Sequence, residues 1–473
     1  MNKKKFILLT GTLPMGSMLV RFPLYAATGN NIPVVRTPVE KQKFTSDAVE
    51  KVITDFGEKT RNKELAWLFN NCFPNTLDTT VDFEMIDGKP DTYVITGDID
   101  AMWLRDSTAQ VWPYLWLIKE DKKLQQLVAC VINRQSKNIL FDPYANAFYK
   151  DVNKISEWKD DGTEMKPGLH ERKWEIDSLC YPIRLSYHYW KATGDATPFD
   201  EHWKKAAALI VKTFKDQQRK TNNGPYKFER RTSWATDGVP LGGYGYPANP
   251  VGLIHSMFRP SDDATIFPFL ILSNFFAVVS LKHLAEMINS IFKDAAFVKE
   301  YAGLANEIDT ALKRYAIVTH PQFGKVYAYE VDGYGSFNLM DDANVPSLLS
   351  LPYLGAVKNT DPIYVNTRRL LLSNYNPFFF KGTAGDGIGG PHAGTDLIWP
   401  LSIIIRALTS NDDTEIKKCI SMLQHSHAGT GFMHETFNKD DVKKFIRPWF
   451  AWANTIFGEL LHKTAAIKPY LLT

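Results

Sequence analysis

Two stretches of the sequence carry acidic residues that could perform general acid–base chemistry. In the first, SMFRPSDDATIFPFL (residues 256–270), Asp262 and Asp263 follow an Arg-Pro pair at an expected helix start. One of the two acids can cap the helix while the other enters a cavity. A carboxyl group in a crowded, partly apolar cavity has a raised pKa, which suits a general acid. The pattern leaves open which acid takes which part.

The second acid–base candidate is Glu435. It follows His434 in a loop between two expected helices, and Trp449 and Trp452 lie at the start of the second helix. A carboxylate in such an aromatic setting can activate a water molecule as a general base. The pair does not complete the zinc motif H-E-x-x-H, because Asn438 stands where the second histidine would be.

Aromatic and charged residues gather in the loops, in a mixture that favours a sugar-binding pocket. The C–H face of a pyranose packs on an aromatic ring, and its hydroxyl groups bind carboxylates and guanidinium groups. Each residue could instead cap a helix or pair with a neighbouring charge. The candidate binding residues are Trp103, Arg105, Asp106, Trp174, Asp177, Arg259, His392, Asp396, Trp399 and His434.

Several other classes of site do not match the sequence. The glycine-rich residues 381–404 lack the G-K-[ST] of a phosphate-binding loop and follow no βαβ unit. With 55 basic and 52 acidic residues, the chain shows no basic bias of the kind that predicts a nucleic-acid partner. The cysteines form no C-x-x-C pair, so we expect buried free thiols rather than a zinc site. They are Cys72, Cys130, Cys180 and Cys419.

Long helical patterns separate these loops, and they must position the candidate side chains. A first helix is expected from Ser46 onward, and residues 78–96 around Asp87-Gly88 favour a β-hairpin. The patterns show no strand–helix alternation, which excludes a Rossmann fold or a TIM barrel. The other expected helices are 104–119, 122–138, 175–193, 197–217, 263–288, 294–316, 344–351, 361–373, 395–409, 413–425 and 447–463.

The length of 473 residues alone suggests roughly three domains at about 150 residues each. Against that, no linker, low-complexity segment or charge block divides the chain. We therefore expect residues 28–473 to form a single all-α domain, a closed ring of helical hairpins whose loops at one end build the pocket.

Residues 1–27 are expected to be a signal peptide rather than part of the fold. Three lysines precede the largely apolar residues 6–20, and Leu24-Tyr25-Ala26 offers a cleavage site. The alternative is an N-terminal anchor helix, although the apolar run is short for a membrane span. Cleavage removes four basic residues and no acid, which changes the net charge from +3 to −1. We expect an exported protein, periplasmic or secreted, with no membrane span after cleavage.

Five motifs together resemble glycoside hydrolase family 125, the metal-independent exo-α-1,6-mannosidases. They are GDIDAMWLRDSTAQVWPY, FRPSDDAT, GIGGPHAGTDLIWP, GFMHETF and RPWFAWANTIFGEL, and the resemblance extends over about residues 45–463. It implies an (α/α)6 barrel and the inverting release of α-1,6-linked mannose from non-reducing ends, with no metal ion and no cofactor. It also implies that Asp262 is the general acid, with Asp263 as the alternative, and that Glu435 is the general base.

The resemblance further implies that an α-mannoside oligosaccharide or glycan is the substrate and that Arg105, Asp106, His392 and Trp399 line the pocket. We expect a monomer, and a pocket wall built by the glycine-rich residues 382–394. Inversion requires the two catalytic carboxyl groups to lie about 6.5–9.5 Å apart. The alternatives are a non-catalytic glycan-binding protein and another (α/α)6 carbohydrate-active enzyme, such as a metal-dependent mannosidase or a polysaccharide lyase.

Overall fold

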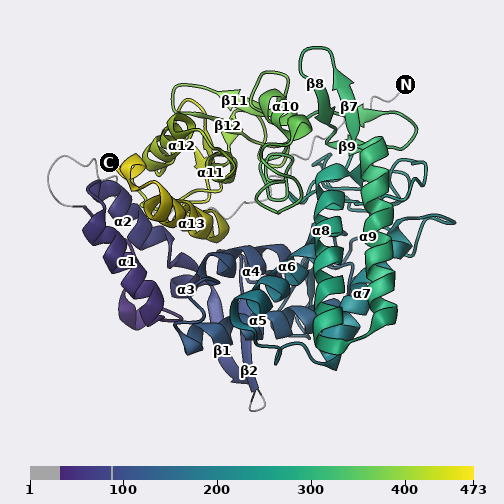
Figure 1. Cartoon of the computed structure of the whole chain (residues 1–473), viewed down its shortest axis with the longest axis horizontal. Coiled ribbons are helices and arrows are strands. Elements are labelled where there is room, and N and C mark those ends of the chain that lie inside the picture. The colour runs from purple at the N-terminus through teal and green to yellow at the C-terminus, as the bar shows by residue number, and fades with distance from the viewer. Residues whose placement is uncertain (1–31, 87–88) are drawn as a thin grey trace, which may run out of the picture.

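The computed structural model describes residues 32–86 and 89–473, and thirteen α-helices within these residues build a ring around a central axis (Figure 1). The predicted signal peptide lies outside the described residues. The helices are α1 (Asp47–Lys59), α2 (Lys63–Cys72), α3 (Asn75–Thr79), α4 (Leu104–Val111), α5 (Lys122–Phe141), α6 (Ile176–Thr193), α7 (Glu201–Gln217), α8 (Ile271–Met287), α9 (Ala295–Tyr315), α10 (Pro362–Leu371), α11 (Pro400–Leu408), α12 (Asp413–Ser426) and α13 (Ala451–Ile467).

The helices form an inner and an outer layer, as in the (α/α)6 barrel that was expected. In the inner layer α6 packs between α4 and α8, and α13 packs against both α4 and α11. In the outer layer α5 packs against α6, α9 against α8, and α12 against α11 (Figure 1). The predicted all-α fold is therefore confirmed.

Burial distinguishes the two layers. All eight residues of α4 are buried, and so is every residue of α13 from 451 to 461. An outer helix buries one stripe only: in α9 the buried residues include Tyr301, Leu304, Ala305, Ile308 and Leu312, which recur at helical spacing. The inner helices thus have neighbours on all sides, and their polar residues must find partners inside the protein.

The predicted β-hairpin is confirmed: β1 (Val81–Ile86) pairs antiparallel with β2 (Lys89–Val94), although its turn lies outside the described residues. The other strands are short pieces in loops. They are β3 (Met102–Trp103), β4 (Ala147–Phe148), β5 (Leu169–Glu171), β6 (Phe269–Leu270), β7 (Ile317–His320), β8 (Gly324–Tyr327), β9 (Glu330–Val331), β10 (Phe337–Asn338), β11 (Phe379–Lys381), β12 (Asp386–Ile388), β13 (Leu397–Ile398), β14 (Thr436–Asn438) and β15 (Phe445–Ile446).

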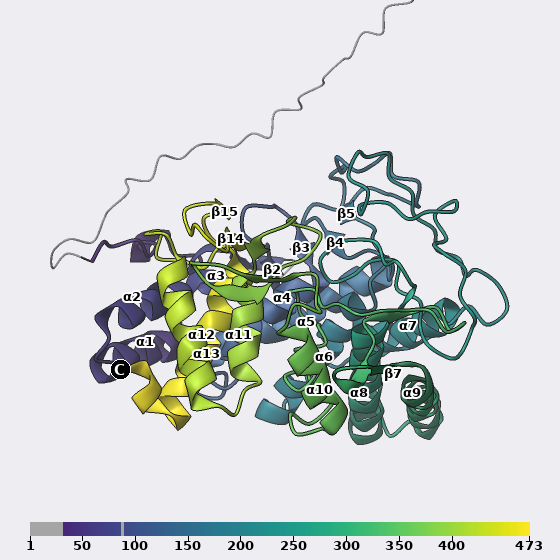
Figure 2. The same cartoon turned by 90° about the horizontal axis from the view of Figure 1, so that it is seen from above.

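Two of these small sheets lie at the same end of the ring. One has the order β3-β4-β5 and the other β13-β14-β15, and the labelled strands β3, β4, β5, β14 and β15 lie along the upper side of Figure 2. Short paired strands satisfy the backbone of long loops and so hold them in one conformation. Both sheets lead directly into inner helices, because β3 precedes α4 and β13 precedes α11.

Several predicted helix boundaries are wrong. Residues 263–270 are irregular apart from β6, and α8 begins only at Ile271. Residues 344–351 form turns, and α11 begins at Pro400 instead of residue 395. The two helices α2 and α3 were not predicted separately. Proline explains most of the differences, since it lacks the N–H that a helix interior needs and is tolerated only in the first turn.

Two further findings concern burial. The four cysteines are all buried and unpaired among the described residues, as predicted. In the same part of the chain one helical stretch, Ile271–Phe292, is long and apolar enough to cross a membrane, yet most of it is buried inside the ring. It consists of α8 and the following turn, so its apolar character is accounted for by its place in the inner layer.

Candidate active site

A hollow is surrounded by residues from five separate parts of the chain. Asp262 and Glu435, which are 173 positions apart in the sequence, both line it, together with Asp106. The other lining residues are Thr96, Ile99, Trp103, Arg105, Pro260, Ser261, Asn344, His392, Trp399, Arg447, Phe450 and Trp452. We call this hollow the carboxylate pocket.

A tight turn presents Asp262 to the carboxylate pocket. The Asp262 N–H donates to the Arg259 carbonyl (2.9 Å), and the Arg259 N–H donates to the Asp263 carbonyl (2.8 Å). Asp262 has a φ of +67°, a left-handed conformation that is unusual for a residue other than glycine. The Ser261 hydroxyl anchors the turn by donating to the Asp342 carboxylate at 2.6 Å.

The two candidate acids have different surroundings. The side chain of Asp262 is 23% exposed and lines the pocket, whereas that of Asp263 is 2% exposed and lies behind the turn. Burial, with the nearby Asp342 carboxylate, raises the pKa of Asp263 to about 6, and Nδ1 of His392 lies 3.9 Å from its Oδ1. Access to the pocket therefore favours Asp262 over Asp263.

Arg105, in the first turn of α4, connects four carboxyl groups. Its Nη1 lies 2.7 Å from Glu175 Oε2 and 3.3 Å from Asp177 Oδ2, its Nη2 lies 3.4 Å from Asp262 Oδ1, and its Nε lies 3.5 Å from Asp106 Oδ2. Glu175 and Asp177 stand at the start of α6, which packs beside α4. A planar guanidinium group with a fixed fork of donors is the side chain best suited to this arrangement.

The environment shifts the acidity of these carboxyl groups in opposite directions. Burial raises the pKa of Asp106 to about 6, although Arg105 opposes the shift. Burial raises the pKa of Glu175 well above its ordinary value. Burial acts on Asp262 in the same sense, but there Arg105 and Lys173 outweigh it and hold the pKa below the ordinary value.

Glu435 is held at the edge of the small sheet β13-β14-β15. Its N–H donates to the Ile446 carbonyl in β15 at 3.2 Å. Its carboxylate lies 3.4 Å from Nε of Arg447, whose Nη1 donates to Asp98 at 2.9 Å. Arg447 has a φ of +54°, so a strained backbone position presents the guanidinium group to both acids. Arg447 thereby orients the Glu435 carboxylate.

The carboxylate pocket also contains aromatic rings and unused hydrogen-bond donors. Trp103, Trp399, Phe450 and Trp452 all contribute to its wall. The indole nitrogens of Trp103 and Trp399 and the amide nitrogen of Asn344 are buried and have no partner among the described residues. Because buried donors are almost always paired in folded proteins, three unpaired donors around one pocket indicate a ligand rich in oxygen acceptors.

Five residues that were predicted to bind substrate do not line the pocket. Trp174 is buried in the core, where its indole N–H donates to the His255 carbonyl (2.7 Å). Asp177 acts behind the pocket, on Arg105. Arg259 is buried against Glu330 at 2.7 Å, where it supports the turn that holds Asp262. These three residues support the site without facing it.

The other two corrections concern His434 and Asp396. The His434 Nδ1–H donates to two carbonyls, of Arg447 and Pro448, and its ring stacks on Phe445 with centroids 3.9 Å apart. Burial lowers its pKa to about 4, so it is a neutral structural group at pH 7. Asp396 is half-exposed, and its nearest cation partner is Lys439 at 3.8 Å.

The glycine-rich loop supplies one lining residue, His392. Two glycines of this loop, residues 382–394, serve close packing instead. A Cβ at Gly389 would lie 2.2 Å from the Leu397 carbonyl oxygen, and one at Gly390 would lie 2.8 Å from Asp342. The loop thus forms a tightly packed support for the turn at Asp262, in place of the broad pocket wall that was expected.

Sequence reasoning missed several lining residues, of which Asn344, Arg447 and Phe450 are the most polar or the largest. Arg447 and Phe450 lie in the motif RPWFAW, next to Trp452, so the motif itself could have indicated them. Asn344 was hidden because its segment was assigned to a helix.

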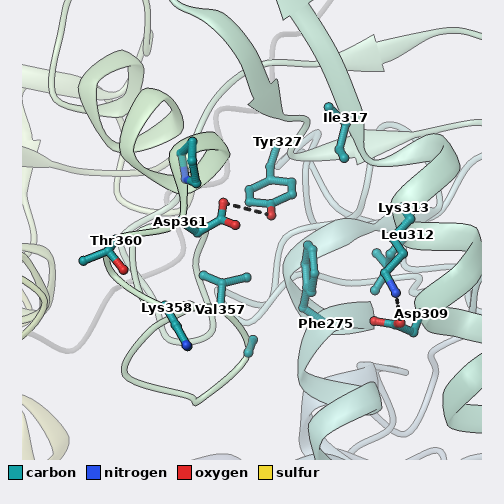
Figure 3. A pocket seen from close by; sticks show the side chains of 12 residues that line it. Phe275, Asp309, Leu312, Lys313, Ile317, Tyr327, Val357, Lys358, Thr360 and Asp361 are labelled. Carbon is teal, nitrogen blue, oxygen red and sulfur yellow. Dashed lines mark hydrogen bonds and ion pairs between the residues drawn. The ribbon is translucent and has the colours of Figure 1, made fainter.

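A second hollow lies between α8, α9 and the start of α10 (Figure 3). Its two carboxylates are already engaged. Asp361 caps α10 and accepts from the Tyr327 hydroxyl at 3.4 Å, and Asp309 pairs with Lys313 at 2.6 Å. This hollow offers no pair of free carboxyl groups in the described structure. The carboxylate pocket is the candidate active site because both predicted acid–base residues, Asp262 and Glu435, line it.

Comparison with known proteins finds a likeness to α-mannosidases over most of the chain. A family model for metal-independent α-mannosidases (GH125) matches residues 62–462. The Meiotically up-regulated gene 157 protein of Schizosaccharomyces pombe is 44% identical over 467 residues, covering 95% of this chain and 92% of that protein. A metal-independent α-mannosidase of Streptococcus pneumoniae, solved in a non-productive complex with α-1,6-mannobiose, has a TM-score of 0.86 and 39% identity, covering 90% of this chain and 100% of that chain.

A more distant structure shows the fold alone. A bacterial glucoamylase complexed with acarbose has a TM-score of 0.54 at 15% identity, covering 89% of this chain and 59% of that chain. The ring of helices is therefore shared beyond the α-mannosidases.

Proposed function

The chain belongs to the GH125 family of metal-independent α-mannosidases, and from this premise we propose that it is an exo-acting enzyme that releases α-1,6-linked mannose from non-reducing ends with inversion. The observation that carries the proposal is that Asp262 and Glu435 line one pocket together with aromatic rings and unpaired donors. The Streptococcus pneumoniae relative with bound α-1,6-mannobiose supports the linkage.

In the proposed reaction Asp262 is the general acid and Glu435 is the general base. Asp262 donates a proton to the glycosidic oxygen as the bond from that oxygen to C1 breaks, and the bonding electron pair stays on the oxygen. Glu435 takes a proton from a water molecule whose oxygen bonds to C1 from the opposite face. The carboxyl groups of an inverting enzyme lie about 6.5–9.5 Å apart, which leaves room for that water.

Other pocket residues bind the sugar in this proposal. Asp106 accepts from sugar hydroxyl groups, and the unpaired N–H groups of Trp103, Trp399 and Asn344 donate to sugar oxygens. Arg447 orients Glu435 toward the attacking water. Such interactions accelerate the reaction when they are stronger in the transition state than in the bound substrate.

Proton NMR during the hydrolysis of α-1,6-mannobiose tests the activity and the mechanism together. We expect β-mannose as the first product, with the same rate in EDTA as without it. Appearance of the α anomer first would contradict inversion, and loss of activity in EDTA would contradict metal independence. Binding of the disaccharide without turnover would favour the alternative, a non-catalytic glycan-binding protein.

Replacement of the proposed base is the matching residue test. Glu435→Gln keeps the shape of the side chain but removes its ability to accept the proton from water. We expect kcat to fall by about 10²–10⁴-fold, with a small change in KM. Full hydrolysis of α-1,6-mannobiose by this variant would overturn the role of Glu435.

We also propose that the protein is exported and works as a monomer, with an α-mannoside oligosaccharide or glycan as its substrate. Export rests on the signal-like residues 1–27. N-terminal sequencing of the protein from a periplasmic or secreted fraction, together with its mass by light scattering, tests both statements. An intact N-terminus would contradict cleavage, and a dimer mass would contradict the monomer.

A further inference from the structure

Behind the carboxylate pocket lies a carboxyl group that the reaction described above does not use, Glu175. It stands at the start of α6 and is 0% exposed. Its Oε2 accepts from Arg105 Nη1 and from the Ser178 hydroxyl, both at 2.7 Å. Its Oε1 has no donor among the described residues. One oxygen of this buried carboxyl group therefore lacks a hydrogen-bond donor.

The group that meets Glu175 is the proposed general acid. Glu175 and Asp262 bind the two terminal nitrogens of the same guanidinium group, Arg105 Nη1 at 2.7 Å and Nη2 at 3.4 Å, which brings their carboxyl groups together. A hydrogen bond between them raises the pKa of Glu175 and lowers that of Asp262. Two ionised carboxylates offer acceptors only, so a hydrogen bond between them requires a proton on one of the two. Like charges at such close range also oppose the ionisation of both groups. The contact therefore indicates a pair that shares one proton.

Charged groups from every neighbouring element bear on this pair. Asp262 is faced by the two cations, through Arg105 Nη2 at 3.4 Å and through Lys173 Nζ, which donates to the Asp262 carbonyl at 3.0 Å. Glu175 shares Arg105 but lies in full burial. The titratable and charged groups around the pair are Arg105 and Asp106 from α4, His170 from β5, Asp177 from α6, Lys173 from the loop before α6 and His392 from the glycine-rich loop.

In the free pocket these charges place the shared proton on Glu175 and not on the proposed general acid, Asp262. Burial raises the pKa of Glu175, while Arg105 and Lys173 overcome the burial of Asp262 and lower its pKa. The shared proton then resides on Glu175, and Asp262 is ionised. A general acid must carry a proton when the glycosidic bond breaks.

We propose that Glu175 is a positioning residue that holds the shared proton and passes it to Asp262 as Asp262 protonates the leaving oxygen; this inference rests on the proposed function. The proton leaves the Glu175 carboxyl group for Asp262, and a proton of Asp262 goes to the glycosidic oxygen. Glu175 becomes a carboxylate that is paired with Arg105. After turnover Glu435 releases to solvent the proton it took from water, and the pair regains one, so the balance closes.

The test compares Glu175→Gln with the wild-type enzyme on two substrates. Glutamine keeps the shape and can donate an N–H to Asp262, but it cannot give up a proton. On α-1,6-mannobiose we expect the alkaline limb of kcat/KM to move to lower pH by one unit or more, because Asp262 must then hold a proton against two cations. On 2,4-dinitrophenyl α-mannoside, whose leaving group needs no protonation, we expect a rate within about threefold of wild type.

Ser178→Ala is the matched variant, and it should shift the alkaline limb of kcat/KM to higher pH or leave it in place. Ser178→Ala removes a donor that stabilises ionised Glu175 and leaves Arg105 untouched. It should hold the alkaline limb at or above the wild-type position, and it keeps the proposal testable if Glu175→Gln does not fold. A downward shift in Ser178→Ala would overturn the proposal.

The failure of this inference is distinct from the failure of the proposed function. If wild-type protein hydrolyses neither substrate, the proposed function is wrong. If wild type is active but Glu175→Gln loses the same factor on both substrates, with its alkaline limb unmoved, Glu175 is merely structural and the inference is wrong.

Discussion

At the scale of single residues, Arg105 determines the electrostatics of the carboxylate pocket. One guanidinium group contacts the proposed acid Asp262, the buried Glu175 and the pocket-lining Asp106. Buried charges are tolerated only when they are paired, and removal of one partner leaves the others uncompensated. The surrounding carboxylates in turn raise the pKa of Arg105, even though burial lowers it. The cation is thus permanent, and the protons of this site reside on its carboxyl groups.

The unpaired indole N–H of Trp399 gives a prediction about substrate binding. Trp399→Phe removes a donor that has no partner in the described structure and lines the pocket. If that donor binds a sugar oxygen, kcat/KM on α-1,6-mannobiose should fall by about tenfold, which corresponds to ~1.4 kcal/mol. Steady-state kinetics on purified protein measure the effect.

Trp203→Phe is the control, since it makes the same change at a paired indole. Trp203 lies in α7, outside the pocket, and its Nε1 donates to the Ser186 hydroxyl at 3.1 Å. This variant should keep wild-type kcat/KM within twofold and lose about 1 kcal/mol of stability for the broken hydrogen bond. Equal losses of activity in the two variants would show that ring volume, and not the Trp399 N–H, matters.

The residue types predicted the pocket better than they predicted which side chain faces it. Trp103, Arg105, Asp106, His392 and Trp399 line it as expected. The five that do not are close to it in sequence, and four of them are buried supports: Trp174, Asp177, Arg259 and His434. Motif membership shows that a residue belongs to a site. Its orientation depends on tertiary packing, which spacing along the chain does not contain.

At the scale of elements, the outer helices were predictable because they have one buried face. The spacing in α1 and α9 predicted both correctly. The inner segments are apolar on all sides, so periodicity does not mark where a helix begins. Residues 263–270 and 344–351 were therefore assigned to helices, although Pro268 and Pro346 interrupt them.

The segment that replaces the predicted helix 344–351, between α9 and α10, depends on Asp341. Its carboxyl oxygens accept from the N–H groups of Leu348 (2.8 Å) and Leu349 (3.0 Å), which fixes the turns there. Burial raises the pKa of Asp341 from 3.8 to about 8, despite these two donors. Between these two pH values the folded state binds more protons than the unfolded state, so this group makes the free energy of unfolding fall as pH rises.

Asp341→Asn should remove that pH dependence, because an amide resembles the neutral carboxyl group. From pH 5 to pH 8 the free energy of unfolding of the variant should rise relative to that of wild type, by up to about 1.4 kcal/mol per pH unit. The melting temperature of the variant should rise relative to wild type over the same range. Thermal unfolding followed by circular dichroism across this range measures it. A difference that is constant or falls with pH would show that Asp341 is ionised throughout.

At the scale of the whole molecule, the ring closes where α13 meets the first helices. Asn454 of α13 donates from Nδ2 to Asn75 at 3.1 Å, and its Oδ1 accepts from the Met433 N–H at 2.7 Å. Asn75 lies in α3, far from Asn454 along the chain, and Met433 lies in the loop between α12 and β14. No local pattern in the sequence shows such a closure. The pairing of the helices therefore predicted a ring, but the residues in contact where the ring closes were not predicted.

At this closure Gly458 of α13 lies against Phe73, the C-cap residue of α2. This contact gives a prediction for the stability of the ring. A Cβ there would lie 2.6 Å from Cδ2 and 2.9 Å from Cα of Phe73, which is buried at the end of α2 and stacked on Phe69. Gly458→Ala should therefore force the two helices apart and destabilise the protein by about 1–3 kcal/mol.

Gly303→Ala is the matched control, because Gly303 is an exposed glycine within α9 and a Cβ there would meet no described atom within 4 Å. That change should stabilise the protein by about 0.5–1 kcal/mol, as alanine does at free helix positions. Thermal melting of both variants measures the difference, and a Gly458→Ala protein as stable as Gly303→Ala would mean that the closure is loose enough to absorb a methyl group.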